Sequence, residues 1–424
     1  MNWLASVVLW LTYLLSLYFA IFFVLVFIDK KTFFDNEKNE RGPLKLKKHP
    51  LISVLIPAYN EEKTVLGTLK SVLALDYPKN KLEVIVIDDG STDQTKKVVE
   101  NFIKDKKQVK LISHKNMGKA ASMNKALKMA GGEFFACLDA DSYVEEKTLK
   151  KMLKLYEQEN DPDLVIVTPA MKVKKPKNIL QKIQRIEYLV MIFAGRLTSH
   201  LDSLYVAPGP FSLYRTEVIK KLGGFDETSL TEDQEIAYRV QKNNYKIKQC
   251  FDGYVETESP GEFKGFYKQR RRWYKGGLGC VYRYRKMVLA KKYGDFGLIQ
   301  MSKNVIGFLL AISGIGFAFY FLLWPFLKKI YNFSFISFDI LPYIYNFDLN
   351  INFLNFDFRK GFIVLFLFGI SILFFYYAHV NVNEKVKKFG IIPLIPYFFV
   401  YYLIKGFIFL LSIVELVVKK KQKW

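Results

Sequence analysis

The feature that most constrains this fold is that apolar residues are concentrated at the two ends of the chain. The segment Trp3–Ile28 is almost uninterrupted hydrocarbon and is long enough to cross a bilayer core of about 30 Å. It lacks a basic start and a small-residue cleavage site, so residues 1–30 are predicted to form a retained anchor. Three further candidate spans follow: Val305–Phe326, Phe362–Ala378 and Ile391–Val418. The last contains Pro393, Pro396 and Lys405, which predicts a kinked or partly interfacial helix.

Charge predicts the orientation of the chain in the membrane. The formal net charge is +23, and basic residues closely follow the first span: Lys30, Lys31, Lys38, Arg41, Lys45, Lys47 and Lys48. The positive-inside rule therefore places the middle of the chain in the cytoplasm and the N-terminus outside. Three later spans would put the tail Lys419–Lys421 outside, against that rule, so the side of the tail stays open. We expect a cell-membrane, multi-pass protein that contacts membrane lipids and an anionic substrate, and no nucleic acid, although the charge alone also suits nucleic acid.

The middle of the chain, residues 50–260, is predicted to be a soluble α/β domain. Short β-rich runs at 51–57, 83–88, 109–113, 134–139 and 164–168 alternate with helical stretches at 61–75, 93–105, 117–130 and 146–159. This alternation predicts βαβ units and a mostly parallel sheet, in which ligands bind beyond the carboxyl ends of the strands. No Gly-x-Gly-x-x-Gly follows the first strand and no Walker motif occurs, so dinucleotide and P-loop sites are disfavoured.

Carboxylates stand at two of these strand ends. Asp139 and Asp141 flank a single residue, so one of them can take Mg²⁺ or Mn²⁺ while the other faces a ligand hydroxyl; the alternative is a loop of solvated acids. Asp88 and Asp89 either accept the N–H of a uracil ring or belong to an ordinary turn. Tyr59, at the end of the first strand, either stacks on the same base or packs locally.

Three later motifs carry candidate chemistry. Lys119 follows a glycine at a predicted helix start, which suits a phosphate but also a solvated surface. Thr231 is a candidate N-cap, and Asp233 two residues later is a candidate general base. The cluster Gln269–Trp273 combines arginines, which bind phosphate, with an indole, which stacks on sugars; alternatively it is a juxtamembrane basic and aromatic belt.

Two further stretches have apolar residues at helical spacing. Residues 179–197 predict either a helix buried against the catalytic sheet or an interfacial helix that docks the domain on the bilayer. Residues 263–274 predict a basic, aromatic interfacial helix. The expected organisation is therefore an anchor at 1–30, the α/β domain at 50–260, interfacial helices at 261–300 and a membrane region at 301–424.

Taken in order, the motifs resemble the family 2 inverting glycosyltransferases, and in particular the membrane-embedded branch of cellulose, chitin, hyaluronan and poly-N-acetylglucosamine synthases. The motifs that carry this resemblance, over about residues 50–280, are Pro57-Ala-Tyr-Asn-Glu-Glu62, Asp88-Asp-Gly-Ser91, Asn116-x-Gly-Lys-Ala120, Asp139-Ala-Asp141, Gly209-Pro-Phe-Ser-Leu-Tyr-Arg215, Thr231-Glu-Asp233 and Gln269-x-x-Arg272-Trp273. The resemblance implies a GT-A-type, Rossmann-like domain.

The resemblance also implies roles for individual residues. The nucleotide and donor sugar would be held by Ala58, Tyr59, Glu61, Asp88, Asp89, Lys119, Asp139, Asp141 and Arg272. Asp141 would carry the Mg²⁺ or Mn²⁺, and Asp233 would deprotonate the acceptor hydroxyl. The acceptor would be held by Glu232, Gln269 and Trp273. Arg270 and Arg271 stand at variable positions of the motif and are expected to be basic surface only.

The function implied is transfer of a sugar from a UDP-sugar, with UDP-N-acetylglucosamine favoured, to the hydroxyl end of a growing β-linked polysaccharide, with export of the polymer as a further expectation. The α-linked donor would give a β-linkage through one base and no covalent intermediate. Two alternatives stay open: transfer of a single sugar to a membrane lipid, as in ceramide glucosyltransferases, and a non-catalytic membrane scaffold. The sequence leaves the oligomeric state open.

Overall fold

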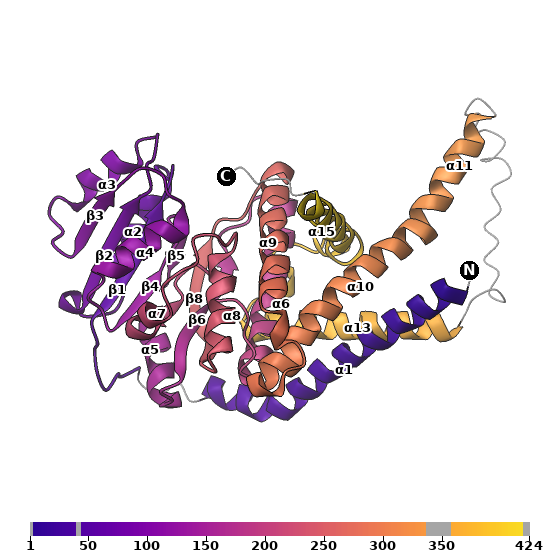
Figure 1. The fold of residues 1–424 in the computed structure, drawn as a ribbon, viewed down its shortest axis with the longest axis horizontal. Coiled ribbons are helices and arrows are strands. Elements are labelled where there is room, and N and C mark those ends of the chain that lie inside the picture. Colours follow the sequence, from indigo (N-terminus) through magenta and orange to yellow (C-terminus); the bar gives the residue numbers. More distant parts are fainter. Residues whose placement is uncertain (1–2, 40–43, 336–357, 419–424) are drawn as a thin grey trace.

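The structure is a computed structural model that describes residues 3–39, 44–335 and 358–418. An α/β domain lies at one end of the molecule, and long helices extend from it toward the other (Figure 1). The helix α1 (Trp3–Asn39) precedes the domain, and the remaining long helices follow it.

The α/β domain is built on one eight-stranded sheet of order β3-β2-β1-β4-β7-β6-β8-β5. Its strands are β1 (Ile52–Ala58), β2 (Leu82–Asp88), β3 (Val109–Ser113), β4 (Phe134–Cys137), β5 (Ser142–Val144), β6 (Leu164–Val173), β7 (Leu213–Arg215) and β8 (Lys246–Thr257). Parallel pairing joins β3, β2, β1 and β4, and also β6 and β8. The expected α/β domain with a mostly parallel sheet is confirmed.

Antiparallel pairing is confined to the short strands β7 and β5. β7 pairs antiparallel with both β4 and β6, and β5 pairs antiparallel with β8. These strands and β8 were not foreseen. They extend the sheet beyond β4. Because the end of β8 pairs with β5, they also bring the segment that follows β8 close to the segment that follows β4.

Helices cover both faces of the sheet, and β1, β2 and β4 are therefore almost entirely buried. One face packs against apolar side chains of α2 (Val65–Leu73), α3 (Thr95–Ile103) and α5 (Thr148–Glu159). The other packs against α4 (Lys119–Met129), α7 (Thr216–Lys221) and α8 (Glu232–Lys242). This two-sided burial explains why the strands read as continuous apolar runs.

The helix α6 (Ile179–His200) joins the domain to the apolar helices. Its N-terminus is capped by the Asn178 side chain, which accepts a hydrogen bond from the Gln181 N–H at 2.9 Å. Phe193 belongs to a cluster that contains Ala170 of β6 and Ala378, and its ring lies 5.6 Å from that of Phe27 in α1. The prediction of a helix buried against the sheet is confirmed, and the same helix also packs on the candidate spans. Docking of this helix on the bilayer stays a prediction.

Within the part of the chain that the structure describes, four helical segments are long and apolar enough to cross a membrane: Trp3–Lys30, Phe296–Asn332, Gly361–Asn381 and Leu394–Val417. They include α1, α10 (Ser302–Ala318), α11 (Trp324–Ser334), α13 (Phe358–Asn381), α14 (Leu394–Pro396) and α15 (Tyr402–Val417). This agrees with the four candidates in the sequence and identifies a membrane protein.

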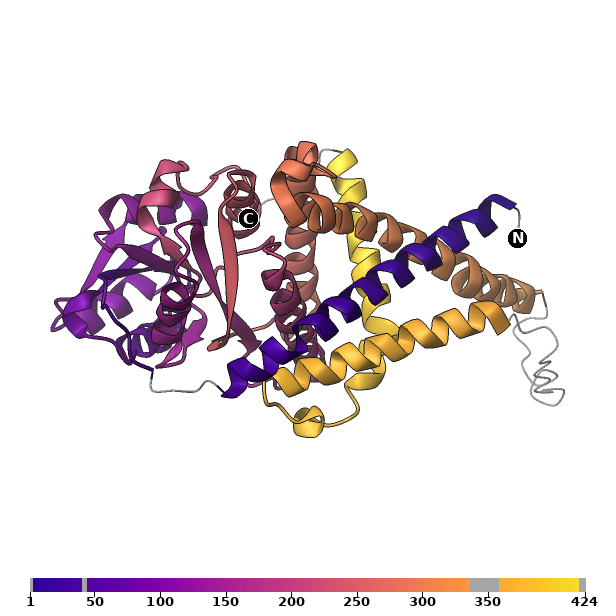
Figure 2. The same cartoon turned by 90° about the horizontal axis from the view of Figure 1, so that it is seen from below.

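The last of these helices has a different direction from the others. In both views α1, α10 and α13 run away from the α/β domain, whereas α15 lies crosswise beside it (Figures 1 and 2). α15 meets α10 at Gly406, where an added Cβ would lie 2.9 Å from the Ile315 side chain. The tail Lys419–Lys421, whose side the sequence left open, lies outside the described residues.

Candidate active site

The carboxyl ends of β1, β2 and β4 lie at one edge of the sheet because the three strands are parallel neighbours. Ala58 stands directly opposite Asp88 in the register of β1 and β2. Leu138 continues β4 by donating its N–H to the Leu55 carbonyl at 2.9 Å, and Asp139 follows it. The predicted donor residues of these three strand ends are therefore brought together.

Lys119 links Asp139 to the acidic start of α8. Its Nζ lies 2.6 Å from Asp139 Oδ1 and 2.9 Å from Glu232 Oε1. Burial alone would lower the pKa of Lys119, but the charges of Asp139 and Glu232 outweigh it and raise that pKa. Gly209 makes room for this contact, since a Cβ there would lie 2.8 Å from Lys119 Nζ. The Lys119 ammonium group is therefore held in its charged form between the strand end and α8.

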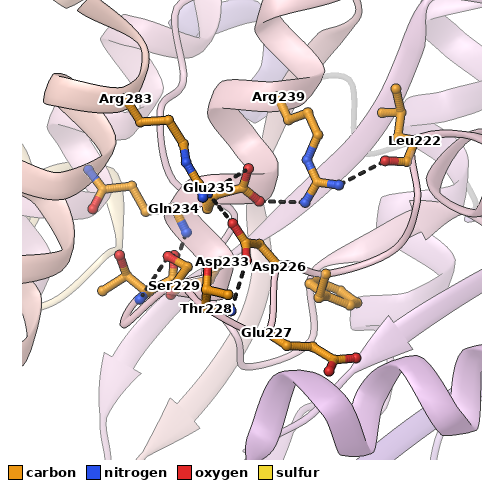
Figure 3. Close-up of polar contacts among 12 residues, drawn as sticks. Leu222, Asp226, Glu227, Thr228, Ser229, Asp233, Gln234, Glu235, Arg239 and Arg283 are labelled. Atoms are coloured by element: carbon orange, nitrogen blue, oxygen red, sulfur yellow. Dashed lines mark hydrogen bonds and ion pairs between the residues drawn. The ribbon is translucent and has the colours of Figure 1, made fainter.

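Asp233 lies in the first turn of α8, and its carboxylate accepts the Gln234 N–H at 2.8 Å (Figure 3). Burial, followed by the charge of Glu232, raises the pKa of Asp233 from 3.8 to about 6. A carboxylate with this pKa is ionised at neutral pH and is a better base than an ordinary aspartate. Its chemistry therefore fits the predicted role of general base.

The arginine of the Gln269-x-x-Arg272-Trp273 motif reaches this acidic site. The motif lies on α9 (Phe263–Arg283), which approaches the start of α8 so closely that a Cβ at Gly276 would lie 2.2 Å from Thr231 Oγ1. Arg272 Nη1 lies 3.4 Å from the Leu230 carbonyl, and its positive charge helps to lower the pKa of Glu232 and opposes the rise at Asp233. Two motifs about 40 residues apart in the chain are thus joined by glycine-mediated packing.

The loop before α8 is held by two arginines that no sequence motif indicated (Figure 3). Arg283, the last residue of α9, pairs with Asp226, whose carboxylate also accepts the Thr228 N–H at 2.8 Å. Arg239 of α8 donates to the Leu222 carbonyl at 2.8 Å. These contacts restrain the loop that leads into α8, the helix that carries the base. Because their partners are distant in sequence or are backbone atoms, spacing could not have revealed them.

The two aspartates after β2 have different surroundings. Asp88 Oδ1 accepts the Ser91 N–H at 3.1 Å. Asp89 accepts the backbone N–H groups of Met117 and Gly118 at 2.8 and 3.0 Å, so it anchors the turn that presents Lys119. The ring of Tyr59, by contrast, is 47% exposed beside them and is free to stack on a ligand.

Comparison with known proteins agrees with this geometry. The glycosyl transferase family 2 model matches residues 53–223. These residues form a family 2 glycosyltransferase domain. A poly-beta-1,6-N-acetyl-D-glucosamine synthase of Staphylococcus epidermidis is 28% identical over 347 residues, 81% of this chain and 77% of the relative. The protein of the same name from Staphylococcus aureus strain COL is 31% identical over 227 residues, 53% of this chain and 54% of the relative.

A solved structure shows a similar fold. The mannosyltransferase of Pyrobaculum calidifontis in complex with GDP-Man and Mn²⁺ superposes with a TM-score of 0.53 at 19% identity, covering 86% of this chain and 97% of the mannosyltransferase. The GT-A architecture is therefore confirmed. The family 2 domain and the synthase relatives, and not this superposition, identify the chain as a glycosyltransferase.

The acids of the glycosyltransferase domain suit a hard divalent cation. Burial, and then the negative charges of Asp139 and Glu61, raise the pKa of Asp141 from 3.8 to about 7. A cation would relieve this repulsion between carboxylates. Among the described residues no group of three His, Cys, Asp or Glu side chains is arranged to hold a metal. One or two carboxylates completed by phosphate oxygens remain a common arrangement for Mg²⁺, so these residues fit such an ion.

One expectation for the glycosyltransferase is wrong. Arg270 and Arg271 are not simply basic surface: Arg270 is 2% exposed and lies 2.6 Å from Glu187 Oε2 of α6, and Arg271 lies 3.2 Å from Glu415 Oε1 of α15. The reason is that α9 is packed between α6 and α15, so consecutive arginines of one helix turn face different buried acids. Trp273 is half-buried beside them.

Proposed function

We propose that this protein is a membrane-integrated inverting glycosyltransferase that moves a sugar from a UDP-sugar to the hydroxyl end of a growing β-linked polysaccharide. UDP-N-acetylglucosamine is the favoured donor because the relatives that match most of the chain are named poly-beta-1,6-N-acetyl-D-glucosamine synthases. The observation that carries the proposal is that Lys119 bridges Asp139 at the strand end to Glu232 at the start of α8, where the charges of Lys119 and Arg272 both act on Asp233.

Each of these groups has a task in a single displacement. Asp233 takes the proton of the acceptor hydroxyl as its oxygen attacks the anomeric carbon, and UDP leaves from the opposite face. Lys119 and Arg272 stabilise the negative charge that develops on the leaving diphosphate. Ala58, Tyr59, Asp88 and Asp89 hold the nucleotide, as they lie at one edge of the sheet.

Further residues position the two substrates in this proposal. Glu61 and Asp139 border the donor, and Asp141 would hold Mg²⁺ or Mn²⁺, which would supply positive charge to the diphosphate. Gln269, Trp273 and Glu232 hold the acceptor. Glu232 already binds Lys119, so the acceptor and donor sides share one charged contact.

Incubation of membranes with a panel of UDP-sugars and Mg²⁺ or Mn²⁺, followed by sizing of the product, tests the proposal. It predicts a ladder of products from UDP-N-acetylglucosamine. It also predicts that Asp233→Asn abolishes transfer while Asp252→Asn, a matched change at a 66% exposed side chain on β8, does not. One sugar attached to a lipid would instead support the single-transfer alternative, and transfer by Asp233→Asn at the wild-type rate would refute the base.

We also propose that the chain crosses the membrane several times with its catalytic domain in the cytoplasm. The basic residues after the first span support this orientation. α15 carries Lys405 and Glu415 in its apolar stretch and lies crosswise beside the domain, which favours a helix at the cytoplasmic interface over a fourth crossing (Figure 2). A tag after residue 424 should then be digested from the cytoplasmic side.

Export of the polymer is a further part of the proposal. A path for the polymer would have to be formed by the long apolar helices that run away from the domain (Figure 1). Purified enzyme in sealed vesicles, supplied with donor outside, should deliver polymer to the lumen. Polymer found only on the donor side would refute export and leave the transfer reaction untouched.

A further inference from the structure

A buried carboxylate that takes no part in the proposed chemistry connects three helices. Glu187, near the middle of α6, is 5% exposed. Its Oε2 lies 2.6 Å from Arg270 Nη2 of α9 and accepts the Tyr401 hydroxyl at 2.6 Å, while its Oε1 lies 2.5 Å from Lys405 Nζ of the last apolar segment. We call Glu187, Arg270, Tyr401 and Lys405 the Glu187 cluster.

Glu187 is held in its ionised form by its partners. Burial acts to raise the pKa of Glu187, but the charges of Lys405 and Arg270 outweigh it and hold that pKa below its usual value. One carboxylate thus serves two cations, and its loss would leave both without a counter-ion in a region shielded from water. The contacts of Glu187 fix α9 and the last apolar segment against α6, which points to a positioning role.

The part of the proposed site that these contacts position is the acceptor side. The guanidinium carbon of Arg270 lies 4.2 Å from the centre of the Trp273 ring, one helical turn further along α9. Glu187 therefore holds one side of a planar cation whose face lies against the indole. Since Trp273 is the residue expected to stack on the acceptor sugar, the orientation of its ring depends on where Arg270 is held.

We infer that Glu187 and Arg270 are positioning residues for the acceptor: Glu187 holds Arg270, and Arg270 orients Trp273 for the acceptor sugar. This inference rests on the proposed function. It predicts that release of Arg270 impairs capture of the activated sugar by the acceptor but leaves binding of the donor intact. Water would then compete for the sugar, so more of the UDP released would be accompanied by free sugar.

The Glu187 cluster provides a double variant that keeps the net charge of wild type, and a single variant that serves as its control. Lys405→Met leaves the Glu187–Arg270 pair in place and should behave as wild type. Glu187→Gln combined with Lys405→Met removes one charge of each sign, so the buried net charge equals that of wild type, but Arg270 loses its counter-ion. The measurement is the fraction of released UDP that corresponds to sugar incorporated in product, together with the dissociation constant for UDP.

The expected result is at least a fivefold fall in the incorporated fraction for the double variant relative to Lys405→Met, with UDP binding unchanged. Arg270→Lys should show the same fall, since it keeps the pair with Glu187 but lacks the planar group against Trp273. This variant replaces the double variant in the test if the double variant fails to bind UDP. Glu187→Asp should recover part of the loss. The inference would be overturned if the double variant and Arg270→Lys, where they bind UDP, gave the same incorporated fraction as Lys405→Met. Wild type that transfers no sugar from any UDP-sugar would instead overturn the proposed function, and the inference with it.

Discussion

Substituting Asp233 with Asn should inactivate the enzyme and stabilise it. The pKa of Asp233 is raised from 3.8 to about 6 by burial and by Glu232. A difference of about 2.2 pKa units corresponds to about 3 kcal/mol at pH well above 6. Asn keeps the oxygen that accepts the Gln234 N–H but carries no charge. The general base is therefore held at the expense of stability.

The pH dependence follows from the direction of the shift. Below pH 3.8 the Asp233 carboxyl is protonated in both the folded and the unfolded protein, so ionisation costs no stability. Between pH 3.8 and about 6 the carboxyl ionises in the unfolded protein but stays protonated in the folded protein, so stability falls over this interval and the loss is complete above about pH 6. The advantage of Asp233→Asn should be close to its full value of about 3 kcal/mol at pH 8 and roughly half of that at pH 5.

Thermal unfolding in detergent without nucleotide or metal measures this difference. Domains of this size shift by roughly 2–4 °C per kcal/mol, so the midpoint of Asp233→Asn should lie roughly 6–12 °C above wild type at pH 8. Asp252→Asn, at an exposed side chain, should not shift it. A variant less stable than wild type at pH 8, or a gain that does not depend on pH, would refute the account of Asp233 as a destabilised buried base.

Three other predictions concern the same site. The activity of wild type should decline below about pH 6. Glu232→Gln should move this decline to lower pH because it removes a negative charge that raises the pKa of Asp233. An active Glu232→Gln variant whose activity declines at the same pH as wild type would contradict this assignment. Gly209→Ala should reduce the transfer rate roughly 10- to 100-fold because the added Cβ displaces the flexible end of Lys119 from Asp139. The free energy of unfolding should change by less than about 1 kcal/mol. Kinetics measure the transfer rate, and thermal unfolding measures the stability. Removal of divalent metal with a chelator should abolish transfer, and added Mg²⁺ or Mn²⁺ should restore it; transfer that persists in the chelator would exclude the metal.

The sequence predicted the core of the fold because its strongest signals are local. Continuous apolar runs such as 83–88 identify buried strands, and the unbroken stretch Trp3–Ile28 identifies a candidate span. The site residues at strand ends followed from the rule that ligands bind at the carboxyl edge of a parallel sheet. The structure brings these residues together, which leaves their individual roles to be tested.

The elements that were missed depend on non-local contacts. β8 contains Lys246, Lys248, Gln249 and Asp252 and does not read as a buried strand, although it pairs with both β6 and β5. β7 has only three residues between two antiparallel neighbours. Such strands form because neighbouring strands of the sheet offer them hydrogen-bonding partners, and the local sequence pattern does not indicate those partners.

The burial of Arg270 and the direction of α15 were also beyond the sequence. Length and composition admit α15 as a membrane span as readily as α13, although Pro393, Pro396 and Lys405 had already predicted a kinked or partly interfacial helix. The partners of Lys405 and Glu415 on α6 and α9 support the interfacial interpretation. An arginine run looks like surface until the acids that neutralise it are located. Here those acids lie 83 and 144 residues away in the chain.

The most direct test of the central claim is to determine both the anomeric configuration and the length of the product that purified enzyme makes from ¹³C-labelled UDP-N-acetylglucosamine. In-line displacement with Asp233 as the single base predicts a ladder of β-linked sugars from wild type and no product from Asp233→Asn. An α-linked product, or a product that still forms in Asp233→Asn at the wild-type rate, would contradict the account.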